Sequence, residues 1–307
     1  MDIIKVIYKL LLVFCFVLNS QFVHAFEIET KFDQLTSSNF GVNASLADLD
    51  SIMNLVTEPQ KSLTGKSFLT VNKMGFDVFG NKQSQDSWII LDILEFTKNV
   101  QRPVLDIGCG YGYISLQILS NDAIKVIAND IALEHLLNVR KIALKQGLPL
   151  KNLYLNNKKF PKNLSFDENS LSTVILHRVL HFLSPNEIEV GLSKIQKWLQ
   201  PGGKVFIVVM TPQHKEFSDW FLPIYEQEWK KGNKWPGTGL KVERALPDQA
   251  YNLPEFLHVM DERPLRYALE RSGFSIEKVH FLSMKHFGKT PETRDGQEAI
   301  GIVAIKK

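Results

Sequence analysis

Three glycines at alternate positions, Gly108, Gly110 and Gly112, follow a short apolar segment and precede residues with helical spacing. Glycine lets the backbone turn sharply and lets a ligand approach a peptide plane closely. The amino end of the following helix would also favour a negative ligand group. Such a loop suits nucleotide-like ligands in general. Its spacing, G-x-G-x-G, differs from the dinucleotide fingerprint G-x-G-x-x-G, because Tyr113 stands where that fingerprint needs glycine.

Two carboxylates narrow the choice of ligand. Asp106 lies two residues before the first glycine, where it would repel a pyrophosphate but suits a positive ammonium group. Asp130 follows a second apolar segment, and a carboxylate at that place can accept hydrogen bonds from both hydroxyls of a ribose. The ligand implied carries a ribose and an amino-acid ammonium group but no phosphate. S-adenosylmethionine fits this description and is the predicted cofactor.

The segments that must position these residues alternate between strand and helix patterns. Apolar runs predict strands at 103–107, 124–128, 152–155, 172–176, 204–210, 275–283 and 299–306. Helical spacing predicts helices at 46–56, 84–98, 111–120, 133–146, 184–199 and 263–272. The alternation predicts an α/β fold with a doubly wound, mostly parallel seven-stranded sheet and ligands at the carboxyl ends of its strands. The last strand would be antiparallel.

Local signals support one of these helices in particular. Ser184 and Glu187 form a capping box, and Pro185 between them occupies the first helical position. The run Gln200-Pro201-Gly202-Gly203 is expected to stop the same helix before the next strand begins.

Four motifs, in this order along the chain, resemble those of a known family. They are VLDIGCGYG at 104–112, VIANDI at 126–131, SLSTVILHRVLHFL at 170–183 and LQPGGKVFIVV at 199–209. Together they resemble the class I S-adenosylmethionine-dependent methyltransferases, in the branch with small-molecule and related substrates, over about residues 84–307. The resemblance implies a Rossmann-like methyltransferase fold with helical cap elements.

The resemblance also implies a set of cofactor contacts. Asp106, Gly108 and Gly110 would lie along the methionine part of the cofactor. Asp130 would bind the ribose, and Ile131 would pack on the adenine. The predicted cofactor-binding loop is completed by Cys109, Tyr111 and Gly112.

At two places the sequence departs from the family pattern. The family often has an acidic residue after the third strand that contacts the adenine amine, and here Asn156 or Asn157 would have to serve. Ser172 and Thr173 stand where the family commonly has an aspartate early in the fourth strand. Neither departure abolishes cofactor binding in principle, because an amide can still accept that hydrogen bond.

His177 is the candidate catalytic residue. It lies at the predicted end of the fourth strand, near the transferred methyl, as a base or substrate contact; a packing role is the alternative. His177 and His181 could share a helix face, but no acidic or thiol partner lies at metal spacing, so no metal site is predicted. Methyl transfer needs little acid–base chemistry, because the enzyme mainly aligns the reactants and excludes water.

The amino terminus has the order of a secretory signal. A basic start precedes an apolar run at 10–18, and Ala25 provides a small residue for cleavage. The run is too short to cross a bilayer, which needs about 20 apolar residues. Residues 1–25 are therefore predicted to be a signal peptide. The protein would be periplasmic or secreted after cleavage, and otherwise membrane-anchored or cytoplasmic, with no membrane span expected once the signal is removed.

The rest of the chain divides into two predicted parts. Residues 26–83 are expected to form an amino-terminal cap, with the aromatic segment 66–79 as a lid. Residues 84–307 are expected to form the methyltransferase domain, with an aromatic-rich insertion at 211–260 that could line a substrate pocket, form the core of a cap, or do both. Cleavage would remove Cys15 and leave Cys109 without a disulfide partner.

Composition limits the partners. The chain is 44% hydrophobic and 22% charged, as in ordinary globular proteins, and its formal charge of +3 does not indicate a nucleic-acid partner. The signature N-P-P-Y of amide methylation is absent after the fourth strand, which argues against methylation of nucleic-acid bases. Two hypotheses remain: a methyltransferase acting on a small molecule or a protein side chain, and a non-catalytic S-adenosylmethionine-binding or regulatory protein.

Overall fold

The computed structural model describes residues 27–53, 56–63, 65, 67–77, 87–282 and 296–307. The predicted signal at 1–25 lies outside the described residues. The same holds for the first three residues of the helix predicted at 84–98, and for the two ends of the predicted lid at 66 and 78–79.

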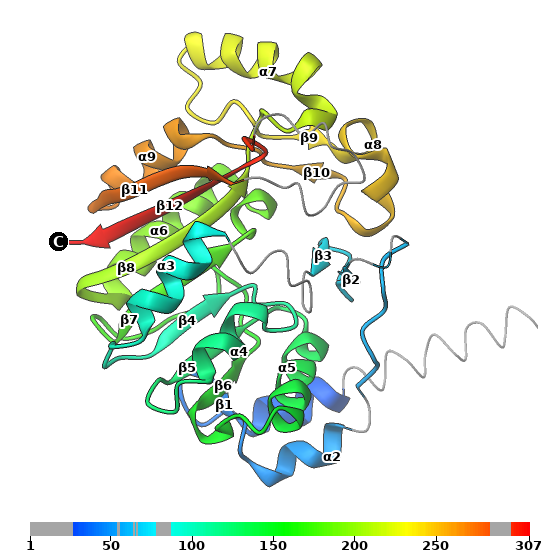
Figure 1. The fold of residues 1–307 in the computed structure, drawn as a ribbon, viewed down its shortest axis with the longest axis vertical. Helices are drawn as coiled ribbons and strands as arrows, with labels where there is room; N and C mark the ends of the chain where they lie inside the picture. Colours follow the sequence, from blue (N-terminus) through cyan, green and yellow to red (C-terminus); the bar gives the residue numbers. More distant parts are fainter. Residues whose placement is uncertain (1–26, 54–55, 64, 66, 78–86, 283–295) are drawn as a thin grey trace, which may run out of the picture.

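Eight strands of the described part of the chain form one sheet. They are β1 (Val42–Asn43), β4 (Val104–Ile107), β5 (Val126–Asn129), β6 (Leu153–Asn156), β7 (Leu171–His177), β8 (Leu199–Met210), β11 (Phe274–Leu282) and β12 (Ala299–Lys306). Their spatial order is β1-β6-β5-β4-β7-β8-β12-β11 (Figure 1). The five strands from β6 to β8 are parallel, whereas β12 lies antiparallel between β8 and β11. The predicted doubly wound fold with an antiparallel last strand is therefore confirmed.

The sheet differs from the prediction in two details. The eighth strand, β1, pairs antiparallel with β6 through only two residues, too few to give a strand pattern in the sequence. β8 begins at Leu199, not at Lys204, because the expected stop sequence is itself drawn into the sheet, where Leu199 pairs with Leu171.

Helices cover both faces of this sheet (Figure 1). One face carries α3 (Trp88–Thr97), α4 (Tyr113–Leu119) and α5 (Leu133–Lys145), and the other carries α6 (Pro185–Trp198) and α9 (Glu262–Arg271). Each face of the sheet packs against its helices to form a hydrophobic core. Successive residues of a strand alternate between these cores: Val126 and Ala128 of β5 lie in the first and Ile127 lies in the second. Residues 54–55 of the helix predicted at 46–56 lie outside the described residues; its described part contains η1 (Ala47–Leu49) and α2 (Asp50–Met53).

The aromatic-rich insertion builds a third, smaller core above the sheet. Its elements are α7 (Lys215–Lys230), β9 (Leu240–Lys241), α8 (Val242–Ala245), η5 (Pro247–Asn252) and β10 (Phe256–Leu257). Phe217 and Tyr225 are fully buried in this core, which gives these aromatics a packing role. Tyr251 and Leu257 line a cavity, and Leu257 also belongs to this core, so the insertion supplies both a core and a cavity wall.

A hairpin of the amino-terminal segment lies over the carboxyl ends of the central strands. It consists of β2 (Phe68–Leu69) and β3 (Phe76–Asp77), which pair antiparallel. We call residues 67–77 the strap. Its two sides reach different parts of the molecule, because the Val71 amide contacts His135 of α5 while the Gly75 carbonyl accepts a hydrogen bond from Asn252.

The capping box of α6 is formed as predicted and can be tested. The Ser184 hydroxyl accepts from the Glu187 amide, and the Glu187 carboxylate accepts from the Ser184 amide at 2.9 Å. We expect Ser184→Ala to lower the free energy of unfolding by about 1 kcal/mol, because an end amide loses its acceptor. Ser184→Asp keeps an acceptor and should stay close to the wild type. Urea unfolding measures both, and equal stability of all three proteins would contradict a role for the cap.

Candidate functional site

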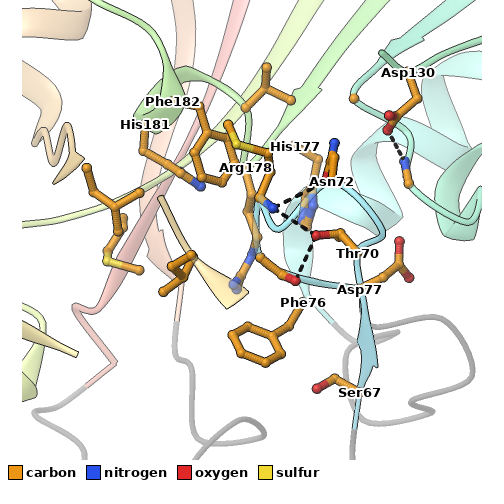
Figure 2. Close-up of a pocket in the computed structure, with 18 of the residues that line it drawn as sticks. Ser67, Thr70, Asn72, Phe76, Asp77, Asp130, His177, Arg178, His181 and Phe182 are labelled. Carbon is orange, nitrogen blue, oxygen red and sulfur yellow. Dashed lines mark hydrogen bonds between the residues drawn. The ribbon is translucent and has the colours of Figure 1, made fainter. Parts of the chain in front are cut away.

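A cavity of about 920 Å³ opens at the carboxyl ends of β4, β5 and β7. The strands β5 and β7 lie on opposite sides of β4, so this is the point where the direction of winding changes and where such sheets bind ligands. The volume is near the upper end of the range for small-molecule sites. Figure 2 shows Thr70, Asn72 and Phe76 of the strap on one side of the cavity and His181 and Phe182 on the other.

The glycine loop after β4 forms the floor of one end of this cavity. Gly108, Gly110 and Gly112 have φ values of 65°, 55° and 81°, in the region that other residues rarely adopt. A Cβ on Gly108 would lie 2.6 Å from the Val179 side chain, and one on Gly110 would lie 2.1 Å from Asp77 Oδ2. Backbone conformation and close packing against Val179 and Asp77 therefore both favour glycine, and the close approach of a ligand to the loop stays a prediction.

Asp106 lies beneath this loop with only 2% of its surface exposed. The Ser115 hydroxyl donates a hydrogen bond to Asp106 Oδ2 at 2.7 Å. Burial raises the pKa of Asp106 to about 7, the Ser115 hydrogen bonds oppose this shift, and the charges of Asp77 and Asp130 add to it. A carboxylate that ionises with such difficulty favours a cationic neighbour, so the residues present fit an ammonium group.

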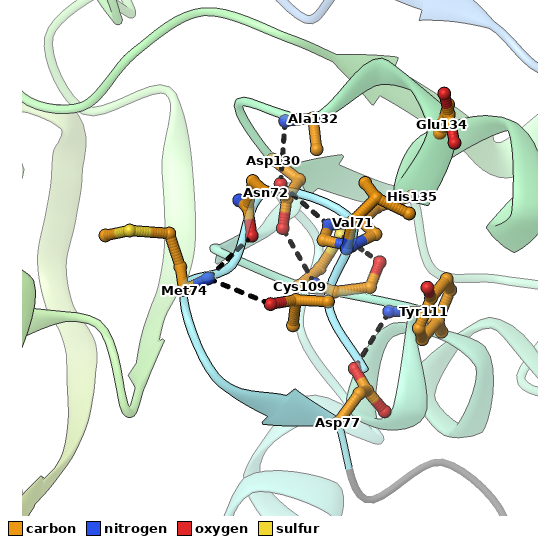
Figure 3. A network of polar contacts seen from close by, with 12 residues as sticks. Val71, Asn72, Met74, Asp77, Cys109, Tyr111, Asp130, Ala132, Glu134 and His135 are labelled. Atoms are coloured by element: carbon orange, nitrogen blue, oxygen red, sulfur yellow. Dashed lines mark hydrogen bonds and ion pairs between the residues drawn. The ribbon is translucent and has the colours of Figure 1, made fainter. Parts of the chain in front are cut away.

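Asp130 lies directly after β5, where two backbone amides donate hydrogen bonds to it and His135 contacts it (Figure 3). Its Oδ2 accepts from the Gly110 amide at 3.0 Å, and its Oδ1 accepts from the Ala132 amide at 2.9 Å. His135 Nδ1 lies 3.0 Å from the same Oδ1, without hydrogen-bond geometry. A carboxylate offers about four acceptor positions, so Oδ2 keeps one for a ribose hydroxyl. That Asp130 accepts both ribose hydroxyls stays a prediction.

The other predicted cofactor residues divide into two groups. Ile131 and Cys109 line the cavity, and Ile131 is 49% exposed, so its apolar side chain is available to a planar ring. Burial raises the pKa of the Cys109 thiol, which disfavours the thiolate and any nucleophilic role. Tyr111 and Gly112 lie outside the cavity lining: the Tyr111 hydroxyl donates to Leu69 of the strap at 2.9 Å, and Gly112 is the N-cap residue of α4.

Asn156 and Asn157 also lie outside the residues that line the cavity. The Asn156 amide group donates to the Asn39 carbonyl at 3.0 Å and accepts from Asn129 and from the Lys158 amide. These contacts tie β6 to the amino-terminal segment, so the Asn156 side chain already has structural partners and does not face the cavity as the sequence analysis expected.

The opposite end of the cavity is rich in histidine. His177 lies there at the end of β7, as predicted, together with His181 and His214. Burial, together with the charge of Arg178, lowers the pKa of His177 and His181 to about 3 and that of His214 to about 4. All three imidazoles are therefore neutral near pH 7. Arg178 itself has a φ of 64°, a strained conformation for arginine of the kind found at functional sites.

Two residues of the site were not found from the sequence. Asp77 Oδ2 accepts a hydrogen bond from the Tyr111 amide at 2.9 Å, and His135 contacts Asp130. Asp77 lies far from the motifs in sequence, so no spacing could indicate it. His135 could have been suspected, because the pattern of Leu133, Leu136 and Leu137 marks that side of the helix as buried. Among the described residues, no three His, Cys, Asp or Glu side chains gather at a spacing that could hold a metal ion.

Comparisons with known proteins agree with this geometry. Residues 104–203 match the family model described as "Methyltransferase domain". A mouse protein named arginine hydroxylase NDUFAF5, mitochondrial, is 34% identical over 106 residues. That match covers 34% of this chain and 28% of the relative, so this chain spans less than a third of the length of that relative.

Solved structures share the fold. A S-adenosylmethionine-dependent methyltransferase from Methanosarcina mazei is 21% identical, with a TM-score of 0.52, over 70% of this chain and 96% of its own. The magnesium protoporphyrin IX methyltransferase from Synechocystis, solved with bound S-adenosylhomocysteine, is 15% identical, with a TM-score of 0.50, over 84% and 94%. Residues 104–203 thus match a methyltransferase domain, and the fold is that of the class I S-adenosylmethionine-dependent methyltransferases, as predicted. The predicted cofactor is the one this class uses.

The burial of Asp106 makes a prediction for stability. The folded state keeps a proton that the unfolded state releases between about pH 4 and pH 7, so this group makes stability fall as pH rises through that window. We expect Asp106→Asn to remove this dependence and to raise the free energy of unfolding at pH 8 by about 2–4 kcal/mol. Chemical unfolding at pH 5 and pH 8 measures the change.

Ser115→Ala is the matched control for that prediction. It removes the donor that favours the ionised carboxylate, so the loss of stability from pH 5 to pH 8 should become larger. The prediction fails if Asp106→Asn and Ser115→Ala change the pH dependence in the same direction.

Proposed function

We propose that this protein is a methyltransferase that binds S-adenosylmethionine at the glycine-loop end of the cavity and methylates a second molecule held at the histidine-rich end. The observation that carries the proposal is the buried Asp106 carboxylate beneath three left-handed glycines, at the point where the sheet changes its direction of winding. A loop of that shape admits a ligand closely, and a carboxylate of raised pKa there selects a ligand with a positive charge.

Each part of the cofactor has a matching group in the chain. Asp106 would take the ammonium group, and Gly108 and Gly110 would lie along the methionine part. The open acceptor position of Asp130 would take a ribose hydroxyl, and Ile131 would cover the adenine. When bound, S-adenosylmethionine supplies a methyl group activated by a sulfonium.

The histidine-rich end of the cavity is better suited to orient the methyl acceptor than to remove a proton from it. Imidazoles with a pKa of about 3 are weak proton acceptors at neutral pH, but they still form directional hydrogen bonds. His177 therefore fits the role of an acceptor contact better than that of a general base. This is sufficient for methyl transfer, which depends chiefly on alignment of the reactants and exclusion of water.

The walls of this end favour a small, partly apolar acceptor. They include Phe76, Phe182, Met210, Leu253 and Leu257. The strap covers the cavity from the side, which suits a molecule that can be enclosed. Among protein side chains, arginine is the first methyl acceptor to test, because the mouse relative is named an arginine hydroxylase. The same name makes hydroxylation the second reaction to test for this protein.

A non-catalytic cofactor-binding protein is the alternative function. It is favoured by the side chain of Asn156, which has structural partners where the family often offers an acid to the adenine amine. The alternative keeps cofactor binding and differs only in turnover, so the two functions separate in one assay.

Calorimetry with S-adenosylhomocysteine tests the binding step. We expect saturable binding by the wild type, none by Asp106→Ala, and an affinity at least about tenfold weaker for Asp130→Asn, which corresponds to a loss of about 1.4 kcal/mol. Ser184→Ala, a change in the α6 cap, should bind as the wild type does. Absence of binding heat at millimolar S-adenosylhomocysteine would contradict the proposal.

A turnover assay separates the two functions. Release of S-adenosylhomocysteine from S-adenosylmethionine with any member of an acceptor panel would reject the non-catalytic alternative.

For the cellular location, we propose that residues 1–25 direct export and are cleaved after Ala25. Within the described residues, no helix combines the length and apolar character needed to span a membrane. Mass spectrometry of the mature amino terminus should show a chain that begins at Phe26. An intact amino terminus recovered from a cytosolic fraction would refute export.

A further inference from the structure

His135 holds two contacts that require opposite properties of its two ring nitrogens (Figure 3). The side chain is 1% exposed and lies near the start of α5. The Val71 amide of the strap donates to Nε2 at 3.1 Å, so Nε2 must carry a lone pair. Nδ1 lies 3.0 Å from Asp130 Oδ1, a close contact without hydrogen-bond geometry. Burial lowers the pKa of His135, but the nearby carboxylates, chiefly Asp130, outweigh burial and raise it. The neutral form with its hydrogen on Nδ1 is the one that lets Nε2 accept from the Val71 amide.

The same corner of the structure holds the strap in two further places. The Tyr111 hydroxyl donates to the Leu69 carbonyl at 2.9 Å, and the Tyr111 amide donates to Asp77 Oδ2 at 2.9 Å. The Tyr111 ring meets the His135 ring edge to face, with centroids 4.8 Å apart. Tyr111 and His135 together therefore fasten the strap over the glycine loop, and of these two only His135 also contacts Asp130.

From this arrangement we propose that His135 is a positioning residue that couples the nucleotide end of the cofactor site to closure of the strap. The proposal rests on the proposed function, because it assigns the Asp130 carboxylate to a ribose. A ribose hydroxyl on Oδ2 would hold the Asp130 carboxylate in place. The carboxylate contacts the His135 imidazole, and the imidazole accepts the hydrogen bond of the Val71 amide. Coupling between two sites is reciprocal, so a closed strap also holds Asp130 ready for the ribose.

Two substitutions of His135 separate the function of Nδ1 from that of Nε2. In His135→Asn, the amide nitrogen lies near the place of Nδ1, which keeps the donor to Asp130 and removes the acceptor for Val71. In His135→Gln, the amide group reaches the place of Nε2, which keeps the acceptor for Val71 and removes the donor to Asp130. His280→Asn is the matched control, since His280 is exposed on β11, an edge strand separated from β5 by four strands in the sheet order.

The readouts are the hydrogen-exchange rates of the strap amides 67–77, with and without S-adenosylhomocysteine, and the affinity for that ligand by calorimetry. In the wild type and His280→Asn, saturating ligand should slow strap exchange by about three- to tenfold. His135→Asn should exchange the strap faster by a similar factor in the free protein, with little loss of affinity. His135→Gln should keep strap exchange of the free protein near the wild type and lose about three- to tenfold in affinity. In neither variant should the ligand slow strap exchange.

Two results would contradict the proposed coupling. Ligand protection of the strap that persists in both variants would overturn the coupling, as would identical effects of the two variants on exchange and affinity. Tyr111→Phe provides a second probe if a His135 variant does not fold: it should speed exchange at Leu69 in the free protein, while ligand still slows exchange of the strap because His135 is intact. If the wild type binds no S-adenosylhomocysteine, the proposed function fails, whereas the different effects of the two variants on free-protein exchange still decide whether His135 anchors the strap.

Discussion

Three carboxylates placed close together around one glycine loop are the constraint on which the rest of the site depends. Asp77 comes from the strap, Asp106 from β4 and Asp130 from the end of β5; burial raises the pKa of Asp106, and the charges of the other two add to that rise. Like charges in a buried site cost free energy unless donors or cations surround them. The chain supplies donors from Ser115 and from the amides of the loop, with His135 in contact with Asp130, and these groups fix the orientation of each carboxylate.

The two ends of the cavity differ in their buried ionisable groups. Asp106 and Asp130 lie at the ends of β4 and β5, whereas burial, together with the charge of Arg178, lowers the pKa of His177 and His181 at the end of β7. Further acidic residues also line the cavity, namely Glu187, Glu216, Asp248 and Glu298. A ligand with a positive charge would therefore suit the buried carboxylates, and a neutral or partly apolar group would meet the neutral imidazoles. This division gives the two reactants of a group transfer different places, which is the alignment that such a reaction requires.

The parts of this structure that could be predicted from the sequence are those encoded locally. The apolar runs predicted all the strands of the sheet except β1, and Ser184 with Glu187 predicted the start of α6. The loop with Asp106 was predictable because glycine and carboxylate requirements lie within a few residues. Asp77 and His135 were not, because the strap reaches the site through tertiary contacts whose partners are 34 and 64 residues away in the chain. For the same reason the Asn156 side chain was misjudged, since its partner Asn39 is 117 residues away.

The strap also links the electrostatics of the site to its shape. Asp77 brings a third negative charge to the loop, and Tyr111 holds the strap beside it through hydrogen bonds to Asp77 and Leu69. Closure of the strap without a cation thus leaves Asp106 with a raised pKa, whereas an open strap would hydrate the same carboxylates and remove part of that cost. A cationic ligand replaces the missing water with a favourable charge, so its binding and the closed strap stabilise each other. The arrangement that makes the empty site electrostatically unfavourable is therefore also the one that ties closure to the presence of the ligand.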